Sequence, residues 1–345
     1  MKRVGLLGLP QSGKSTVFDI LLMGAGASAP AAHGRESIGV VRVPDPRLDR
    51  LAALYQPKKT VYAQIQFVDT VATVAGSTRS AAKGQDLFSA VRNCDALAAV
   101  LGHFDEASDP ARDLRTLEAE LILNDLALAE GRLERIDKEL RIGKRQNERE
   151  HALLARCKTL LEAEHPLRDQ TFEPDEDKQL RGFQLLTLKS LLIVDNQGDV
   201  ARAAPPAGAG AGREIVTLRA LLEREVLGLP PAERESFRAE LGVGEDGLSV
   251  VIRACYHLLG LQSFFTVGED ECRAWTVSRG ARAVEAAGEI HSDLAKGFIR
   301  AEVVPWDKLL EAGSEAKARE RAWMRLEGRD YEVQDGDCIT VRFNK

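Results

Sequence analysis

The sequence predicts an α/β fold: a P-loop domain with a mainly parallel sheet, an inserted antiparallel helical hairpin and a C-terminal β-rich domain. Three observations support this prediction. In residues 1–112, short apolar runs alternate with helical periodicity, as in sheets covered by helices. The loop Gly8–Thr16 fits G-x-x-x-x-G-K-[ST]. Residues 261–345 contain short strand-like runs separated by turns.

The loop lies between an expected strand at residues 4–7 and an expected helix at residues 16–22. Glycines allow a tight wrap whose N–H groups point at phosphate oxygens, and the helix N-terminus adds its positive dipole end. We expect Lys14 to reach the β- and γ-phosphates as the catalytic residue, and Ser15 to bind Mg²⁺. A glycine-rich turn that fits by chance is the alternative. The expected nucleotide contacts in the loop are Gly8, Pro10, Gln11, Ser12, Gly13, Lys14, Ser15 and Thr16.

A second strand, at residues 65–68, ends at Asp69. A carboxylate in this place holds Mg²⁺ in P-loop proteins, and ligands of open α/β sheets bind at the carboxyl ends of strands. The alternative is that Asp69 only caps a turn. Together with the loop, Asp69 and Ser15 predict a magnesium site.

Further strands are expected at residues 96–101, 191–194 and 214–217. After the second of these, Asn196, Gln197 and Asp199 have the N-x-x-D layout of guanine readers, in which the carboxylate accepts from guanine N1–H and its amine. An Asx-rich turn is the alternative. Residues 201–212 are rich in Ala, Pro and Gly and predict a surface loop. Helices are expected at residues 218–227, 230–241 and 248–259.

Residues 113–161 have few glycines, no proline and leucines at three- and four-residue spacing. This pattern predicts two long helices that fold back near Gly143. Arginines and lysines alternate with acids along the segment, which is typical of a solvated helix face. Residues 141–147 hold three basic residues and no acid, so a phosphate-contacting tip is the alternative.

C-terminal strands are expected at residues 264–267, 272–277, 301–304, 331–333 and 338–343, with a tight turn at residues 335–337. The predicted domains are therefore a P-loop domain at 1–112 and 183–260, a helical insertion at 113–182, and a C-terminal domain at 261–345.

The net charge of −6 gives no general attraction to nucleic acid, so such contact would need a local basic patch. Five scattered cysteines form no C-x-x-C pair or zinc spacing, which favours free thiols in a reducing cytoplasm. No apolar run is long enough for a membrane span, and no signal peptide precedes the first strand. We expect a cytoplasmic monomer.

The chain resembles the YchF/Obg-like ATPase family, a branch of the translation-factor class of P-loop GTPases. The similarity runs nearly end to end and is densest at the C-terminus. The matching strings are residues 43–49, 109–113, 261–268, 273–277, 287–293, 296–303 and 328–337. The resemblance implies a C-terminal TGS domain of the β-grasp type, slow hydrolysis of ATP or GTP with Mg²⁺, and association with ribosomes or other RNA. It assigns base reading to Asn196 and Asp199.

Several residues depart from the family pattern. Asp199 replaces the Glu that accompanies ATP preference, which favours guanine. The first-switch Thr is missing from residues 33–38, and Ala72 replaces the Gly that senses the γ-phosphate. Thr73 stands where the family has a hydrophobic residue in place of a catalytic Gln. Two functions therefore stay open: a slow NTPase that regulates ribosome or RNA association, and a non-hydrolysing adaptor acting through its helical and TGS domains.

Overall fold

The structure is a computed structural model that describes residues 1–24, 31–33, 36–70, 88–141, 147–198, 202, 213–241 and 246–344. The chain forms two compact units, which are described separately. The sheet unit comprises residues 2–39 and 66–251, and the C-terminal unit comprises residue 1, residues 40–65 and residues 252–345. Residues 40–65, which we expected in the P-loop domain, thus group with the C-terminal part. The predicted domain boundaries stay a prediction.

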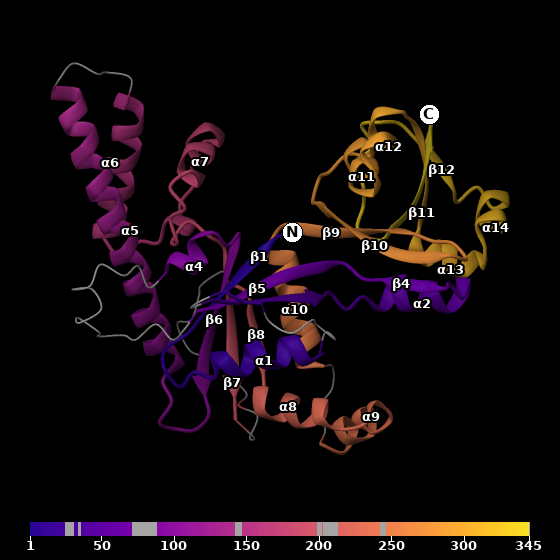
Figure 1. The fold of residues 1–345 in the computed structure, drawn as a ribbon, viewed down its shortest axis with the longest axis horizontal. Helices are drawn as coiled ribbons and strands as arrows, with labels where there is room; N and C mark the ends of the chain where they lie inside the picture. Colours follow the sequence, from indigo (N-terminus) through magenta and orange to yellow (C-terminus); the bar gives the residue numbers. More distant parts are fainter. Residues whose placement is uncertain are drawn as a thin grey trace. The chain divides into compact units, whose positions relative to one another are not determined.

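A seven-stranded sheet has the strand order β2-β3-β5-β1-β6-β7-β8 (Figure 1). Its strands are β1 (Arg3–Leu7), β2 (Ala31–His33), β3 (Glu36–Arg42), β5 (Gln64–Thr70), β6 (Ala96–His103), β7 (Leu191–Gln197) and β8 (Ile215–Leu218). The neighbours from β5 to β8 pair in parallel, and β2 pairs antiparallel with β3. The α/β class is confirmed, as are the five strands expected here. Strands β2 and β3 were not expected.

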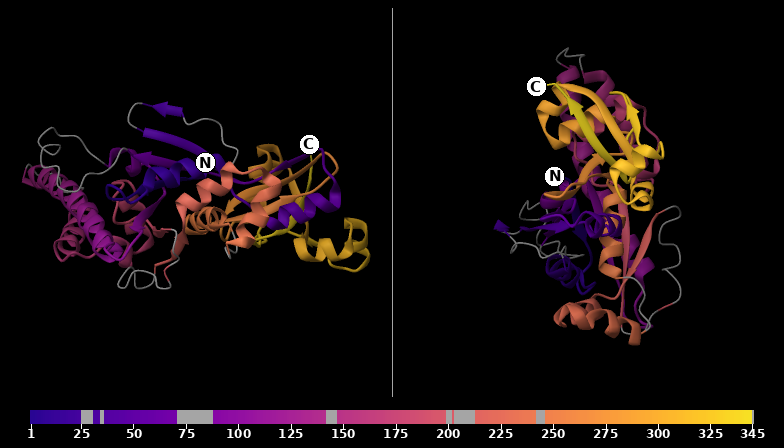
Figure 2. Two further views of the ribbon diagram at one scale, coloured as in Figure 1. Left: turned by 90° about the horizontal axis from the view of Figure 1, so that it is seen from below. Right: turned by 90° about the vertical axis from the view of Figure 1, so that its right-hand side faces the viewer.

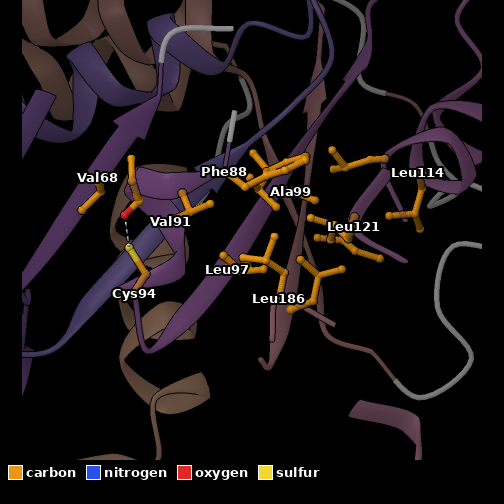
Figure 3. Packing of buried hydrophobic residues seen from close by; sticks show 14 of the residues in the cluster. Val68, Phe88, Val91, Cys94, Leu97, Ala99, Leu114, Leu121 and Leu186 are labelled. Carbon is orange, nitrogen blue, oxygen red and sulfur yellow. Dashed lines mark hydrogen bonds between the residues drawn. The ribbon is translucent and has the colours of Figure 1, made fainter. Parts of the chain in front are cut away.

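The helices of this part of the chain connect the strands. They are α1 (Lys14–Gly24), α4 (Ser89–Arg92), α5 (Pro110–Arg141), α6 (Glu148–Glu162), the short 3-10 helix η2 (Leu167–Asp169), α7 (Pro174–Arg181), α8 (Ala220–Gly228), α9 (Pro231–Glu240) and α10 (Gly247–Leu258). Helix α8 begins two residues later than expected, because Leu218 still pairs with Asn196 in the sheet. The buried cluster between the sheet and α4 and α5 is drawn in Figure 3, where Val91, Leu97 and Leu121 pack together.

The predicted helical hairpin is α5 and α6, which lie side by side (Figures 1 and 2). Apolar residues of both helices and of the following segment share one core, which includes Ile122, Leu153, Cys157 and Leu161. Gly131 in the middle of α5 has open space around it. The expected turn near Gly143 and most of the expected basic tip lie outside the described residues.

The C-terminal unit contains a six-stranded sheet in the order β12-β11-β13-β9-β10-β4. Its strands are β4 (Lys59–Val61), β9 (Leu261–Thr266), β10 (Glu271–Ser278), β11 (Phe298–Pro305), β12 (Arg325–Glu327) and β13 (Asp337–Phe343). Its helices are α2 (Pro46–Tyr55), α11 (Ala283–Ile290), α12 (Ser292–Lys296), α13 (Trp306–Ala312) and α14 (Glu315–Glu320). Strand β4 comes from the first quarter of the chain and pairs with β10.

One strand prediction in this unit was wrong. Residues 331–333 form only an isolated bridge, between Glu332 and Arg282. The Val333 amide donates to Ala281 O, and Ala283 N donates to Tyr331 O, so this segment pairs with the loop before α11 instead of a strand. The expected turn at residues 335–337 does form, with Gly336 at φ 91°.

All five cysteines are buried, with their sulfurs as thiols. Within the described residues, no helix has both the length and the apolar character needed to cross a membrane.

Candidate nucleotide site

The loop between β1 and α1 is a tight cradle. Gln11 and Gly13 have positive φ values of 68° and 82°. The Ser12 amide donates to Leu9 O at 3.1 Å, and α1 begins at Lys14. A Cβ on Gly8 would lie 2.5 Å from Ser12 Oγ and 2.9 Å from Val100 O, so no side chain fits there. The backbone therefore wraps closely at the N-terminus of α1, as a phosphate-binding loop requires.

Lys14 and Asp69 meet at the carboxyl ends of adjacent parallel strands. The register of β1 on β5 pairs Leu6 with Asp69, which puts the carboxylate beside the loop. Lys14 Nζ forms an ion pair with Asp69 Oδ1, and the two side chains are 5% and 14% exposed. A lysine this buried needs a negative partner, which Asp69 supplies here and a phosphate would supply in a complex.

The oxygen donors of this site fit Mg²⁺. Ser15 is exposed in the first turn of α1 and offers a hydroxyl, and Asp69 offers a carboxylate. Both are hard oxygen ligands, and Mg²⁺ is typically held by one or two such groups together with substrate phosphates. No group of three or more His, Cys, Asp or Glu in the described part of the chain is arranged to hold a metal by itself. Ser12 Oγ is buried and has no hydrogen-bond partner among the described residues, so one polar atom in the cradle is unsatisfied.

Asn196 connects the loop to the far part of the sheet. Its Nδ2 donates to Ser12 O at 3.0 Å, and its Oδ1 accepts from the Ala220 amide at the start of α8 at 3.1 Å. A Cβ on Gly13 would lie 2.2 Å from this Nδ2. Gly13 is therefore required both by its positive φ and by the close approach of Asn196.

Gln197 points into the protein. Its side chain is 3% exposed, and its Nε2 donates to Asp195 Oδ2 at 2.8 Å and to Arg202 O at 3.1 Å. Asp195 also lies 3.1 Å from His103 Nδ1. These contacts stabilise the end of β7 and leave Gln197 no exposed edge for a ligand. Asp199 and the switch residues 71–87 lie outside the described residues.

Phe104 is a site residue that the sequence analysis missed. It follows β6, and its side chain is 41% exposed. A Cβ on Gly102 would lie 2.9 Å from Phe104 Cε2, and one on Gly13 would lie 3.6 Å from Cζ. The ring thus lies beside Gly13 of the loop and Gly102 of β6, and Gly198, directly after β7, approaches the backbone carbonyl of Phe104. The sequence did offer a signal for Phe104. It is an aromatic residue directly after an apolar strand, and the neighbouring strand leads into the N-x-x-D segment.

Comparisons with known proteins identify relatives of this chain. The family model YchF-GTPase_C, described as "Protein of unknown function (DUF933)", matches residues 261–344. The ribosome-binding ATPase YchF of Bacillus subtilis is 38% identical over 361 residues, which cover 99% of this chain and 98% of that protein. The protein of the same name from Haemophilus influenzae is 35% identical over 359 residues, with 99% of each chain covered.

A solved structure has the same fold. The Schizosaccharomyces pombe YchF GTPase superposes with a TM-score of 0.80 at 24% sequence identity, covering 99% of this chain and 97% of that one.

Proposed function

This chain belongs to the YchF family, and from that premise we propose that it binds a purine nucleoside triphosphate with Mg²⁺ and hydrolyses it slowly. We propose further that the nucleotide state regulates binding to the ribosome or its RNA in the cytoplasm. The names of the relatives, ribosome-binding ATPases, support the partner and the reaction class. The expectation of a monomer stays a prediction.

The observation that carries the proposal is the meeting of the Gly8–Gly13 cradle, Lys14 and Asp69 at the ends of two parallel strands. In a complex, the loop amides and Lys14 would hold the phosphates and stabilise charge on the transferred group. Ser15 and Asp69 would hold Mg²⁺, whose chemistry is to neutralise charge on the β- and γ-phosphates.

The base would lie between Phe104 and the N-x-x-D segment. Asn196 is buried and bonded to both the loop and α8, so its role would be to hold the loop against the base site. The Phe104 ring offers a stacking surface that does not discriminate between purines. Discrimination would fall to Asp199, whose carboxylate favours guanine because it accepts from N1–H and the exocyclic amine.

Titration with labelled ATP and GTP tests this proposal. Wild type is expected to bind both, with GTP preferred, and Asp199→Glu is expected to shift the preference towards ATP. Failure of both nucleotides to bind at millimolar concentration would contradict the proposed site.

The non-hydrolysing adaptor is the second candidate, and the substitution of the switch glycine by Ala72 favours it. A Cβ at a position that needs glycine backbone angles would impair sensing of the γ-phosphate. Single-turnover phosphate release, with Lys14→Ala as control, separates the two functions: release above that control identifies the NTPase, and release equal to it identifies the adaptor.

A further inference from the structure

One face of the C-terminal sheet carries arginines beyond what its carboxylates balance. In the register of β11 on β13, Arg300 lies directly opposite Arg342, and Glu302 lies opposite Thr340. Residues of alternate positions, Ala301, Val303 and Ile339, pack in the core with α11. Arg300, Glu302, Thr340 and Arg342 therefore share the opposite face of the sheet. Figure 1 shows β11 in this sheet, with β12 and α14 nearby.

Glu302 organises this face. It is 7% exposed and accepts from Arg319 Nη2 of α14 at 3.2 Å and from Arg342 Nη2. The two arginine side chains stay about half exposed, at 54% and 57%. Each guanidinium has five N–H donors, so both keep donors for a ligand after binding Glu302.

Arg300 adds a third positive charge. Its Nη1 extends over Gly328, where an added Cβ would lie 3.7 Å away, and it makes no ion pair with any described residue. Like charges directly opposite each other on a sheet are unfavourable without an anion between them. The other carboxylate acting on this cluster is Glu315 at the start of α14, where burial raises its pKa. Arg325 and Glu327 alternate with Leu326 and belong to the other face of β12.

Leu326 is an exposed apolar side chain on the same face of the sheet. It lies opposite Glu302 in the register of β12 on β11 and is 61% exposed, on an edge strand. Guanidinium groups match phosphate geometry and are weakly hydrated, and an adjacent apolar side chain suits a ribose or base. The exposed part of this sheet face, around Arg300, Arg342 and Leu326, has a combination of groups that fits an extended, flexible polyanion.

We propose that Arg300, Arg319 and Arg342, held by Glu302, bind the phosphodiester backbone of single-stranded RNA across β11 and β13. This inference rests on the proposed ribosome association and names the surface and the chemical class of the partner. Three guanidinium groups against the two carboxylates of Glu302 and Glu315 leave a local excess of positive charge that the acidic chain as a whole lacks.

The test uses the full chain and a fluorescein-labelled single-stranded RNA of about ten nucleotides, followed by anisotropy at several salt concentrations. In the double variant Arg300→Gln/Arg342→Gln, we expect RNA affinity to fall about tenfold and the slope of log K against log salt to decrease in magnitude by about 1.4, for two lost phosphate contacts. Lys58→Gln, which removes an exposed charge next to the opposite sheet edge, is the matched control and should change neither value.

Sedimentation with ribosomes separates this inference from the proposed function. Parallel loss of RNA and ribosome binding in the double variant, with unchanged nucleotide affinity, supports the surface. Unchanged RNA affinity and salt slope would overturn it. Loss of ribosome binding alone would also overturn it, because the partner would then be an acidic protein. If wild type binds RNA through this face but does not sediment with ribosomes, the surface stands and the ribosome proposal fails.

Discussion

Gly13 is the residue on which the shape of the phosphate-binding loop most directly depends. It combines a φ of 82° with a neighbouring amide that leaves no room for a Cβ. The G-x-x-x-x-G-K-S pattern predicted the glycine, and its positive φ follows from the loop type. The hydrogen bond from Asn196 to Ser12 O, which brings this amide next to Gly13, could not be predicted, because it joins residues 184 positions apart.

We expect Gly13→Ala to lower the free energy of unfolding by about 2 kcal/mol and to weaken nucleotide binding, since φ is positive and the Asn196 amide must move. Thermal unfolding and a nucleotide titration measure both effects. The matched control is Gly131→Ala in the middle of α5, where the new methyl group meets nothing within 4 Å. In that variant, the free energy of unfolding should rise by about 0.5–1 kcal/mol. Equal stability of the two variants would contradict the prediction.

Lys14→Ala should weaken triphosphate binding by a factor on the order of 10–100, because charge-assisted hydrogen bonds to the phosphates are lost. Calorimetric titration measures this loss. Lys2→Ala serves as the control, since Lys2 pairs with Asp95 on the same sheet at 2.7 Å and is 47% exposed. An equal effect of the two substitutions would exclude a specific role for Lys14.

At the scale of elements, the Asp335 turn of the C-terminal unit is tied to α2. Arg47, in the first turn of α2, donates to Asp335 Oδ2 at 2.8 Å and to its own N-cap residue Asp45. Burial alone would raise the pKa of Asp335, but the hydrogen bonds from Arg47 and from the Ser263 amide outweigh it and lower that pKa below 3.8. The turn was predicted from Asp-Gly-Asp, whereas its partner in α2 was not, because no local pattern encodes it.

A lowered pKa makes this tie sensitive to acid. The contribution of Asp335 to stability is present above its unfolded pKa of about 3.8 and is lost as pH falls through the lower folded value. We expect Arg47→Gln to lower the free energy of unfolding by about 1 kcal/mol at neutral pH, given the partial exposure of the pair. At pH 3 the loss should be smaller. Urea unfolding at both pH values measures this. Lys58 pairs with the exposed Asp270, so Lys58→Gln should leave the free energy of unfolding almost unchanged at either pH. A cost for Arg47→Gln that does not depend on pH would refute the assignment.

The sequence predicted where helices and strands lie better than which segments they pair with. Periodicity located α5 and α6, and apolar runs located five strands of the larger sheet. Strands β4 and β12, with three residues each, were missed because such short segments carry no periodicity and depend on the sheet they join. Residues 331–333 have strand composition but pair with a loop, which shows tertiary context overriding local preference.

At the scale of the whole molecule, the proposed function predicts that the nucleotide state changes binding to the ribosome. We expect ribosome sedimentation of wild type to differ between the triphosphate and diphosphate states, and Lys14→Ala to remove that difference, because this variant no longer distinguishes the two nucleotides. Equal sedimentation of wild type in both states would mean that the nucleotide does not regulate association.

The burial of all five cysteines has a practical consequence. Burial also raises the pKa of Cys157 to about 11, and that of Cys338 well above its ordinary value, so these thiols stay protonated at neutral pH. Maleimide reagents attack exposed thiolates. One cysteine introduced at an exposed position such as Leu123 on α5 would therefore be labelled selectively in the native chain. A second cysteine at Leu326, whose side chain is also exposed, would place a label on the C-terminal sheet in the same way.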